Sequence, residues 1–391
     1  MYSIKLGCEK IFWGKNAVQQ LKTLEGPRKR AFIVMSGNVL IDVGSYKKVT
    51  DVLEEAGFEY EAYTEVEPEP SFQTILKGAE RMKTFKPDWI IGFGGGSAMD
   101  AAKAMWVFYE NPAYRTLEET MPPNIIENLR VKAKVCCIAT SAGTGSEATR
   151  AALIKDMKQK KKYSVRDMNG RLVPDAAVLD PEFTATMPKS LTAASGMDAL
   201  THAIESYVTP TANPFSKAMS LAAFLYGYKS LEKVYENPED ENAGAEMLAA
   251  SCMGGIAFSN SGLGIVHGIA HSFGAEYGVP HGLANAIVLP YGLEYNSRND
   301  EVKKMYDELA GFIGKKSLAD AIAELSEKIN IPKSMKEKVQ EDTFIKNLDK
   351  LTEKAMSDVA TPFNPIQPTA EQMKELILKV YYGEGGILSE K

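Results

Sequence analysis

The chain has 391 residues and a formal net charge of −6, and a length of this order is typical of two domains. Apolar residues make up 45 % and charged residues 25 %, which is ordinary for a globular protein with a large packed core. The acidic balance argues against a nucleic-acid-binding protein, and no apolar segment predicts a membrane span or a secretion signal. The four cysteines form no C-x-x-C pair, so we expect free thiols and a cytoplasmic location.

The first part of the chain alternates apolar runs, typical of buried strands, with segments of helical spacing. These strand and helix patterns lie, in chain order, at 30–37, 45–57, 59–66, 71–85, 88–93, 98–111 and 134–140. Such alternation, with glycine-rich segments at two strand ends, predicts a parallel α/β sheet that binds ligands at the carboxyl ends of its strands.

From about Ser190 onward the patterns become long and helical, with few β-branched runs. We therefore predict an α/β dinucleotide-binding domain at 1–183 and an all-helical domain, for metal and substrate, at 184–391. A run of lysines near the end of the first domain is typical of a solvated loop and comprises Lys158, Lys160, Lys161 and Lys162. Lys162 could instead reach a phosphate.

A first glycine-rich turn, GFGGGSAMDAAK, follows a predicted strand and opens a helix. Gly94, Gly95 and Gly96 leave room for backbone N–H groups to approach a phosphate at the positive end of the helix. Ser97 could cap the helix or donate to the phosphate. Asp100, in the first turn, is a further candidate for the cofactor site, and a partner for the helix dipole is the alternative role. The segment is neither a Walker A loop nor G-x-G-x-x-G, and a tight turn without ligand is the alternative.

A second turn, SAGTGSEAT, matches G-x-G-x-x-A through Gly143, Gly145 and Ala148. Because no clear acidic residue follows on a later strand, it is not a standard Rossmann fingerprint. Its hydroxyl groups suit hydrogen bonds to a pyrophosphate or a nicotinamide carboxamide. They belong to Thr140, Ser141, Thr144 and Ser146. Two such turns in one α/β domain favour a dinucleotide.

All four histidines lie in the predicted helical domain. Asp198 and His202 are four residues apart and share a helix face, as do His267 and His271, while His281 is expected at the start of a further helix. Imidazole and carboxylate groups suit a divalent Zn, Fe, Mn, Co or Ni ion. HGIAH lacks the glutamate of H-E-x-x-H, which excludes a metalloprotease of that type. Ordinary packed or surface histidines are the alternative.

Taken together, these segments resemble the iron-containing (group III) alcohol dehydrogenases, especially the butanol dehydrogenases and the alcohol dehydrogenase part of bifunctional aldehyde–alcohol dehydrogenases. The motifs are GGGSAMDAAK, TSAGTGSEAT, MPKSLTAASGMDALTHAIESY and GIVHGIAHSFGAEYGVPHGLANAIVLP. The resemblance implies a dehydroquinate-synthase-like architecture, an α/β nucleotide domain followed by a helical domain. It also implies the metal ligands, which would be Asp198, His202, His267 and His281.

The same resemblance implies the cofactor site. Gly95, Gly96 and Ser97 would hold the pyrophosphate, and the rest would be lined by Thr140, Ser141, Thr144 and Lys162. His271 would lie near the nicotinamide without being a ligand. NAD-specific members carry an aspartate after the first strand, where this chain has Gly37 between Ser36 and Asn38. Since an aspartate would repel a 2′-phosphate and this turn would not, we expect NADP(H) rather than NAD(H).

The expected reaction is metal-dependent, NAD(P)-linked interconversion of a primary alcohol and its aldehyde. Fe(II) is the expected ion, with zinc also compatible, and His271 would relay a proton. The alternatives are a polyol dehydrogenase of the glycerol type, a dehydroquinate-synthase-like lyase, and a nucleotide-binding regulator without turnover. The P-N-P motif of many family members is Pro68-Glu69-Pro70 here, so an asparagine contact there is not expected. We expect a small-molecule substrate, a homo-oligomer, and no nucleic acid or membrane.

Overall fold

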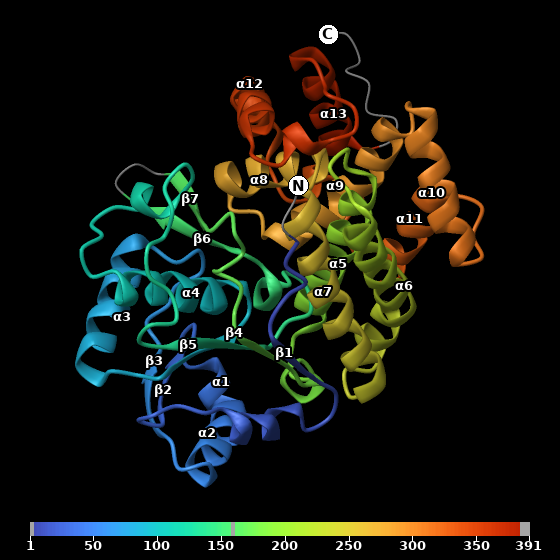
Figure 1. The fold of residues 1–391 in the computed structure, drawn as a ribbon. Helices are drawn as coiled ribbons and strands as arrows, with labels where there is room; N and C mark the ends of the chain where they lie inside the picture. The colour runs from blue at the N-terminus through green and yellow to red at the C-terminus, as the bar shows by residue number, and fades with distance from the viewer. Residues whose placement is uncertain (1–3, 158–160, 384–391) are drawn as a thin grey trace. The chain divides into compact units, whose positions relative to one another are not determined.

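A computed structural model describes residues 4–157 and 161–383 of the chain (Figure 1). By backbone contacts the chain divides into two compact units. The first unit comprises Met1–Met187 with Pro238–Ile256, and the second comprises Pro188–Asn237 with Ala257–Lys391. Residues 238–256 therefore group with the first unit although they follow the first helices of the second.

The first unit is built on a parallel sheet of six strands in the order β1-β8-β5-β4-β2-β3. The strands are β1 (Lys10–Trp13), β2 (Arg30–Val34), β3 (Glu59–Tyr63), β4 (Trp89–Gly94), β5 (Lys134–Ala139) and β8 (Ala176–Leu179). The four strands predicted from the sequence are confirmed, and β1 and β8 are additional short strands. Because all six run the same way, the glycine-rich segments after β4 and β5 leave the same edge of the sheet.

Helices cover both faces of this sheet (Figure 1). They are η1 (Ala17–Thr23), α1 (Val39–Asp42), α2 (Ser45–Glu55), α3 (Phe72–Phe85), α4 (Gly96–Glu110), η2 (Glu118–Thr120), η3 (Ser146–Ala148) and η4 (Pro181–Phe183). One core packs η1 and α2 against the sheet, and the other packs α3 and α4. All six residues of β4 are buried, as expected for a central parallel strand.

An antiparallel hairpin of β6 (Ala151–Asp156) and β7 (Lys161–Arg166) lies beside the sheet. We expected a solvated loop at the lysine run of residues 158–162. Lys161 and Lys162 instead begin β7, whereas Lys158 and Lys160 lie outside the described residues. The strand pattern is hard to recognise in the sequence, because the buried residues Ala152, Ile154, Tyr163 and Val165 alternate with charged and exposed residues.

The second unit is helical. Its helices are α5 (Lys189–Val208), α6 (Pro214–Glu236), α8 (Ile265–Tyr277), α9 (His281–Asn296), α10 (Asp300–Phe312), α11 (Leu318–Lys328), η5 (Met335–Glu337), α12 (Glu341–Ser357), η6 (Thr361–Phe363) and α13 (Ala370–Tyr382). α7 (Glu241–Ser261) belongs to the first unit as far as Ile256. The predicted combination of a parallel α/β sheet and a helical C-terminal part is confirmed.

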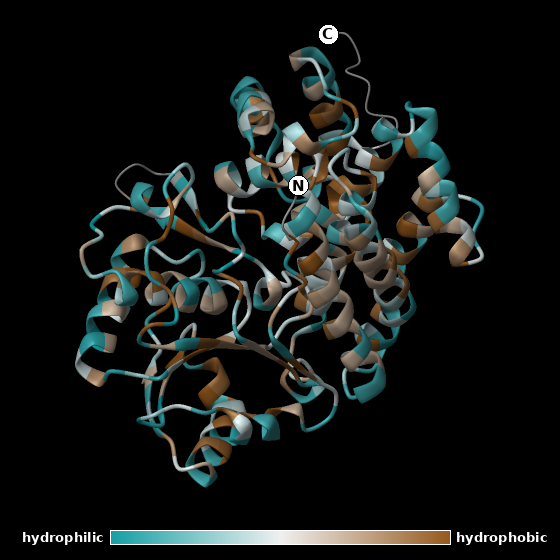
Figure 2. Cartoon of the chain, viewed as in Figure 1, coloured by the Kyte–Doolittle hydropathy of each residue, from teal (hydrophilic) through white to brown (hydrophobic). Residues whose placement is uncertain are grey.

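Local sequence explains several of these helix boundaries. Asn213 and Thr369 each form a capping box at the start of a helix. Pro214 follows Asn213 at the first helical position, where a backbone N–H would have no partner within the helix and its absence costs no hydrogen bond. α5 packs against both α6 and α9. Hydrophobic residues recur along the helices and the strands (Figure 2). Among the described residues no single helix has the length and hydropathy needed to cross a membrane, and α7 and α8 meet that test only as a pair bent by 104°.

Candidate metal and cofactor sites

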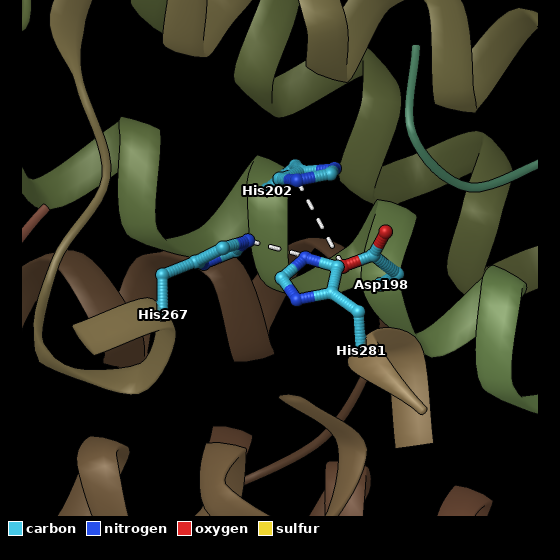
Figure 3. A group of neighbouring side chains, drawn as sticks. All are labelled: Asp198, His202, His267 and His281. Carbon is cyan, nitrogen blue, oxygen red and sulfur yellow. Dashed lines mark ion pairs between the residues drawn. The ribbon is translucent and has the colours of Figure 1, made fainter. Parts of the chain in front are cut away.

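Three helices of the second unit bring four side chains to one point (Figure 3). α5 presents Asp198 and His202 from successive turns, α8 presents His267, and His281 is the first residue of α9. One donor atom from each of the four lies within 4.8 Å of all the others. The structure therefore gathers all four residues that the resemblance implied as ligands.

The cluster is arranged around one carboxylate oxygen. Asp198 Oδ1 lies 3.4 Å from His281 Nε2, and 3.8 Å from the Nε2 atoms of His202 and His267. Asp198, His202 and His267 are buried, whereas the His281 side chain is 41 % exposed and leaves one side accessible. Burial, and secondarily the neighbouring histidines, holds the pKa of His267 well below its usual value, so its lone pair is available. Three imidazoles and a carboxylate fit a divalent first-row ion.

The two glycine-rich turns of the first unit lie side by side. The Thr140 N–H donates to Gly94 O over 3.1 Å. A Cβ on Gly95 would stand 3.2 Å from Ser141 Oγ, and a Cβ on Gly96 would stand 2.9 Å from Thr144 Cγ2. The absence of side chains thus lets the hydroxyl groups of the second turn approach the start of α4, where free backbone N–H groups can bind an anion.

Comparisons with known proteins agree with this geometry. The profile described as "Iron-containing alcohol dehydrogenase" matches residues 8–181, and that described as "Fe-containing alcohol dehydrogenase family, C-terminal" matches residues 192–381. An NADPH-dependent butanol dehydrogenase of Clostridium saccharobutylicum is 42 % identical over 382 residues, covering 95 % of this chain and 96 % of that one. The chain belongs to the iron-containing alcohol dehydrogenase family.

Other members of the family resemble the chain over nearly its whole length. The bifunctional aldehyde–alcohol dehydrogenase AdhE of Escherichia coli (strain K12) is 37 % identical over 395 residues, which cover 93 % of this chain and 44 % of that one. The structure of the iron-containing alcohol dehydrogenase from Thermococcus thioreducens superposes with a TM-score of 0.89 at 33 % identity, covering 97 % of this chain and 100 % of that one.

In this iron-containing alcohol dehydrogenase a buried glutamate fixes the orientation of His267. His267 Nδ1 lies 2.5 Å from Glu205 Oε2, and the backbone N–H of Val266 donates to Glu205 Oε1 over 2.8 Å. Burial raises the pKa of Glu205 to about 8, against the lowering effect of nearby backbone N–H groups. With the hydrogen on Nδ1, the lone pair of Nε2 faces Asp198 and the Asn285 amide, where it can bind a metal ion. Glu205 was not among the residues predicted for this site, although it lies three residues after His202 on the same helix face.

His271 stands beside the cluster and outside the set of four. Its ring stacks on that of His281, with centroids 5.0 Å apart, and its Nδ1 lies 2.9 Å from Asp358 Oδ2. Asp358 follows the end of α12, which ends at Ser357, so a residue 87 positions away orients this imidazole. No local pattern pointed to Asp358.

Lys162 and Ser97 are linked through Glu69. The backbone N–H of Glu69 lies 3.4 Å from Ser97 Oγ, and the Glu69 carboxylate forms ion pairs with Lys162 and Lys155. Partial burial would raise the pKa of Glu69, but its hydrogen bond and charge interaction with Lys162 lower it. Glu69 therefore contacts both Ser97, at the start of α4, and Lys162, so a single residue links these two predicted cofactor residues.

The last two predicted cofactor residues differ in their surroundings. Both carboxylate oxygens of Asp100 bind protein groups: Oδ1 accepts from Ser146 Oγ over 2.5 Å and Oδ2 accepts from the Leu153 N–H over 2.8 Å. Asp100 therefore ties α4 to the second turn and to β6, which favours a structural role. Gly37 adopts a φ of +65° in the turn after β2, next to β4, and a Cβ there would meet nothing within 4 Å.

Proposed function

We propose that the protein interconverts a primary alcohol and its aldehyde with a metal ion and a nicotinamide dinucleotide, as a butanol dehydrogenase does. The observation that carries this proposal is the cluster of Asp198 and three histidines, built from three helices and oriented by Glu205. Its support from relatives is the NADPH-dependent butanol dehydrogenase, which matches over nearly the full length of both chains.

In this proposal the ion is iron, and its ligands are Asp198, His202, His267 and His281. The bound ion would supply Lewis acidity toward the substrate oxygen, and the nicotinamide would supply or accept the hydride. The exposed side of His281 leaves access for a small substrate. His271, oriented by Asp358, would hold the proton that the reaction releases or consumes.

The first glycine-rich turn would hold the pyrophosphate through the backbone of Gly94–Gly96 and through Ser97. The hydroxyl groups of Thr140, Ser141 and Thr144, together with Lys162, would line the rest of the dinucleotide site. We thus assign cofactor binding to residues 1–183, and metal and substrate binding to 184–391. A cytoplasmic homo-oligomer acting on small alcohols and aldehydes completes the proposal.

The proposed coenzyme is NADP(H). The support is the turn at Gly37, which presents no carboxylate of its own to a 2′-phosphate. Gly37→Asp should raise the KM for NADPH at least about tenfold, corresponding to about 1.4 kcal/mol of repulsion, and should change the KM for NADH much less. Gly37→Ala is the control for backbone strain, because it adds a Cβ without charge. Equal effects of both variants on both coenzymes would contradict the assignment.

The reaction is tested on chelator-stripped protein reconstituted anaerobically with Fe(II) or Zn(II). We expect metal-dependent oxidation of NADPH by butanal, with slower oxidation of NADH. His271→Ala should lower turnover far more than metal content, whereas equal losses of both would make His271 a ligand. Absence of activity with each metal, both coenzymes and several short aldehydes would contradict the proposed reaction.

A polyol dehydrogenase is the second candidate. A structure named 1,3-propanediol oxidoreductase superposes on the chain with a TM-score of 0.87 at 29 % identity, covering 97 % of this chain and 100 % of that one. A panel that compares butanol, 1,3-propanediol and glycerol at equal concentrations separates the two candidates. A kcat/KM for either polyol above that for butanol would favour the second.

A further inference from the structure

Two arginines at one end of the β6–β7 hairpin lack an acidic partner. Arg166 ends β7 and pairs with Ala151, so Arg150 directly precedes the strand partner of Arg166. The Asp167 N–H donates to Arg150 O over 3.4 Å, and Arg150 Nη1 donates to Met168 O over a further 3.4 Å. Both arginines are partly buried, and within the described parts of the chain no carboxylate oxygen lies within 4.0 Å of either guanidinium group.

The carboxylate of Asp167, which acts on Arg150 through its charge, is engaged elsewhere. Its Oδ1 accepts from the N–H groups of Asn169 and Arg171, each over 3.0 Å. Its Oδ2 accepts from Arg171 Nε over 3.0 Å and from Arg171 Nη2 over 2.7 Å. Burial lowers the pKa of Arg166, and burial, followed by the charge of Arg166, lowers the pKa of Arg150. Two like charges therefore lie together without compensation.

An unpaired hydroxyl group lies on the same strand as Arg166. Alternation along β7 sends Tyr163 and Val165 into the core, and places Ser164 and Arg166 on the opposite face. Ser164 Oγ is buried and has no hydrogen-bond partner among the described residues. Buried polar atoms in folded proteins are nearly always paired, so this hydroxyl calls for a ligand. A hydroxyl donor and two guanidinium groups thus gather at one end of the hairpin without an anion.

The chemistry of these groups identifies the missing partner. A partly buried charge is destabilising unless it is paired, and arginine is the side chain best suited to pair with a carboxylate or a tetrahedral oxyanion, because its planar N–H groups bind two oxygens at once. We propose that Arg150, Arg166 and Ser164 bind an oxyanion group.

The source of the anion is limited by the proposed function, on which this step of the inference rests. The coenzyme's pyrophosphate is assigned to the first glycine-rich turn, and its 2′-phosphate to the turn at Gly37. The oxyanion at the hairpin is therefore an acidic group of the second reactant or a free anion. Lys162, assigned to the coenzyme site, shares its face of β7 with Arg166 and lies about 13 Å from it along the strand. Both side chains are long, which favours the second reactant: an aldehyde that carries an acidic group.

The test is the binding of sulfate, a tetrahedral oxyanion, to the full-length protein, measured by equilibrium dialysis with labelled sulfate. Arg166→Gln and Arg150→Gln should each bind sulfate at this site at least about tenfold more weakly, because each removes half of its positive charge. Ser164→Ala should weaken binding by about 2–10-fold, the contribution of one hydrogen bond. Addition of NaCl should weaken binding by the wild type.

Arg81→Gln is the matched control, since it makes the same change at an arginine of the first unit that has its own carboxylate partner, Glu61. It should bind sulfate as the wild type does. Sulfate held at the glycine-rich turns is common to all these proteins and does not enter the difference. Equal sulfate binding by the wild type and Arg166→Gln would overturn the proposal. The measurement requires neither metal nor turnover, so its failure is distinguishable from failure of the proposed reaction.

Steady-state kinetics of the metal-loaded enzyme then assign the anion to its source. Butanal and 4-oxobutanoate have carbon chains of equal length and differ in a terminal carboxylate. We expect the ratio of kcat/KM for 4-oxobutanoate to that for butanal to fall at least about tenfold in Arg166→Gln and to stay unaltered in Arg81→Gln. An unaltered ratio in Arg166→Gln, together with lost sulfate binding, would assign the site to a free anion and overturn the assignment to the substrate.

Discussion

The helix-built cluster of the second unit and the glycine-rich turns of the first unit form their sites in opposite ways. At the cluster, the donors are side chains, and buried neighbours contact three of them: Glu205 contacts His267, and Asn285 contacts Asp198 and His281. At the turns, the donors are backbone N–H groups, and the requirement is that side chains are absent from Gly95 and Gly96. One site is therefore sensitive to the loss of atoms, and the other to their addition.

The two regions also differ in the hydrogen bonding of their buried carboxylates. Glu205 accepts from the Val266 N–H and pairs with His267 Nδ1, so its burial is compensated by specific contacts. Glu147, in the second glycine-rich turn, is equally buried, but neither of its oxygens has a hydrogen-bond partner among the described residues. The buried carboxylate is thus paired at the cluster and unpaired at the turn, and we expect substitutions in the two regions to differ in size and in pH dependence.

The largest effect is expected at the cluster. Asp198→Asn removes the one formal negative charge among the four proposed ligands while preserving its shape. Two unit charges about 4 Å apart interact by about 4 kcal/mol at an effective dielectric constant near 20, so metal binding should weaken by about 1,000-fold. Metal content after dialysis measures this loss, with circular dichroism showing that the helices persist. Full retention of metal would remove Asp198 from the ligand set.

Addition of one methyl group should damage the turn through packing. Gly145 has a φ of +61°, and a Cβ there would lie 2.5 Å from Ser251 O and 2.7 Å from Gly255 Cα. Since these are backbone atoms of α7, Gly145→Ala should lower the free energy of unfolding by roughly 2–5 kcal/mol.

Gly37→Ala is the matched control for that substitution. Gly37 has a similar φ of +65° but open space around its Cβ position, so only about 1 kcal/mol should be lost. Urea denaturation followed by tryptophan fluorescence compares the two. Equal losses would show that backbone strain alone, without the contact to α7, sets the requirement for glycine.

The buried carboxyl group of Glu147 predicts that the free energy of unfolding depends on pH. Burial raises the pKa of Glu147 to about 7, above the usual glutamate value, so the folded protein holds this proton more tightly than the unfolded chain does. The resulting stability is complete below the unfolded pKa and is lost as pH rises through the folded pKa, between about pH 4.5 and 7.

Glu147→Gln should remove that dependence. The shift corresponds to about 3 kcal/mol, so the variant should exceed the wild type by up to that amount at pH 8 and gain little at pH 5. Chemical denaturation at the two pH values measures the difference. An equal change at both would show that the carboxyl does not titrate in this range.

The smallest effect is expected where the contacts are exposed. Glu69 and Lys162 are 45 % and 40 % exposed, and such pairs contribute at most about 1 kcal/mol. Glu69→Gln would free Lys162 and Lys155 for a phosphate, so NADPH should bind about 2–5-fold more tightly at low salt. The gain should shrink at high salt because of screening. Unchanged or weaker binding would place these lysines outside the coenzyme site.

Much of the framework could be predicted from the chain. Apolar runs identified β2, β3, β4 and β5, and Pro280 before His281 indicated the start of a helix there. The short strands β1 and β8 were missed because four residues carry too little periodicity. The β6–β7 hairpin was missed because its lysines are typical of a loop, whereas its strand pairing comes from tertiary context.

The sequence by itself determined which residues could act, since glycines at strand ends and side chains four apart on a helix follow from local geometry. It identified the ligand set only through resemblance to a family. The tertiary structure decided how Glu205 orients His267, how Asp358 orients His271, and that Asn285 stands among the ligands. Those partners lie up to 87 residues apart, and helix packing, rather than local periodicity, determines which of them meet.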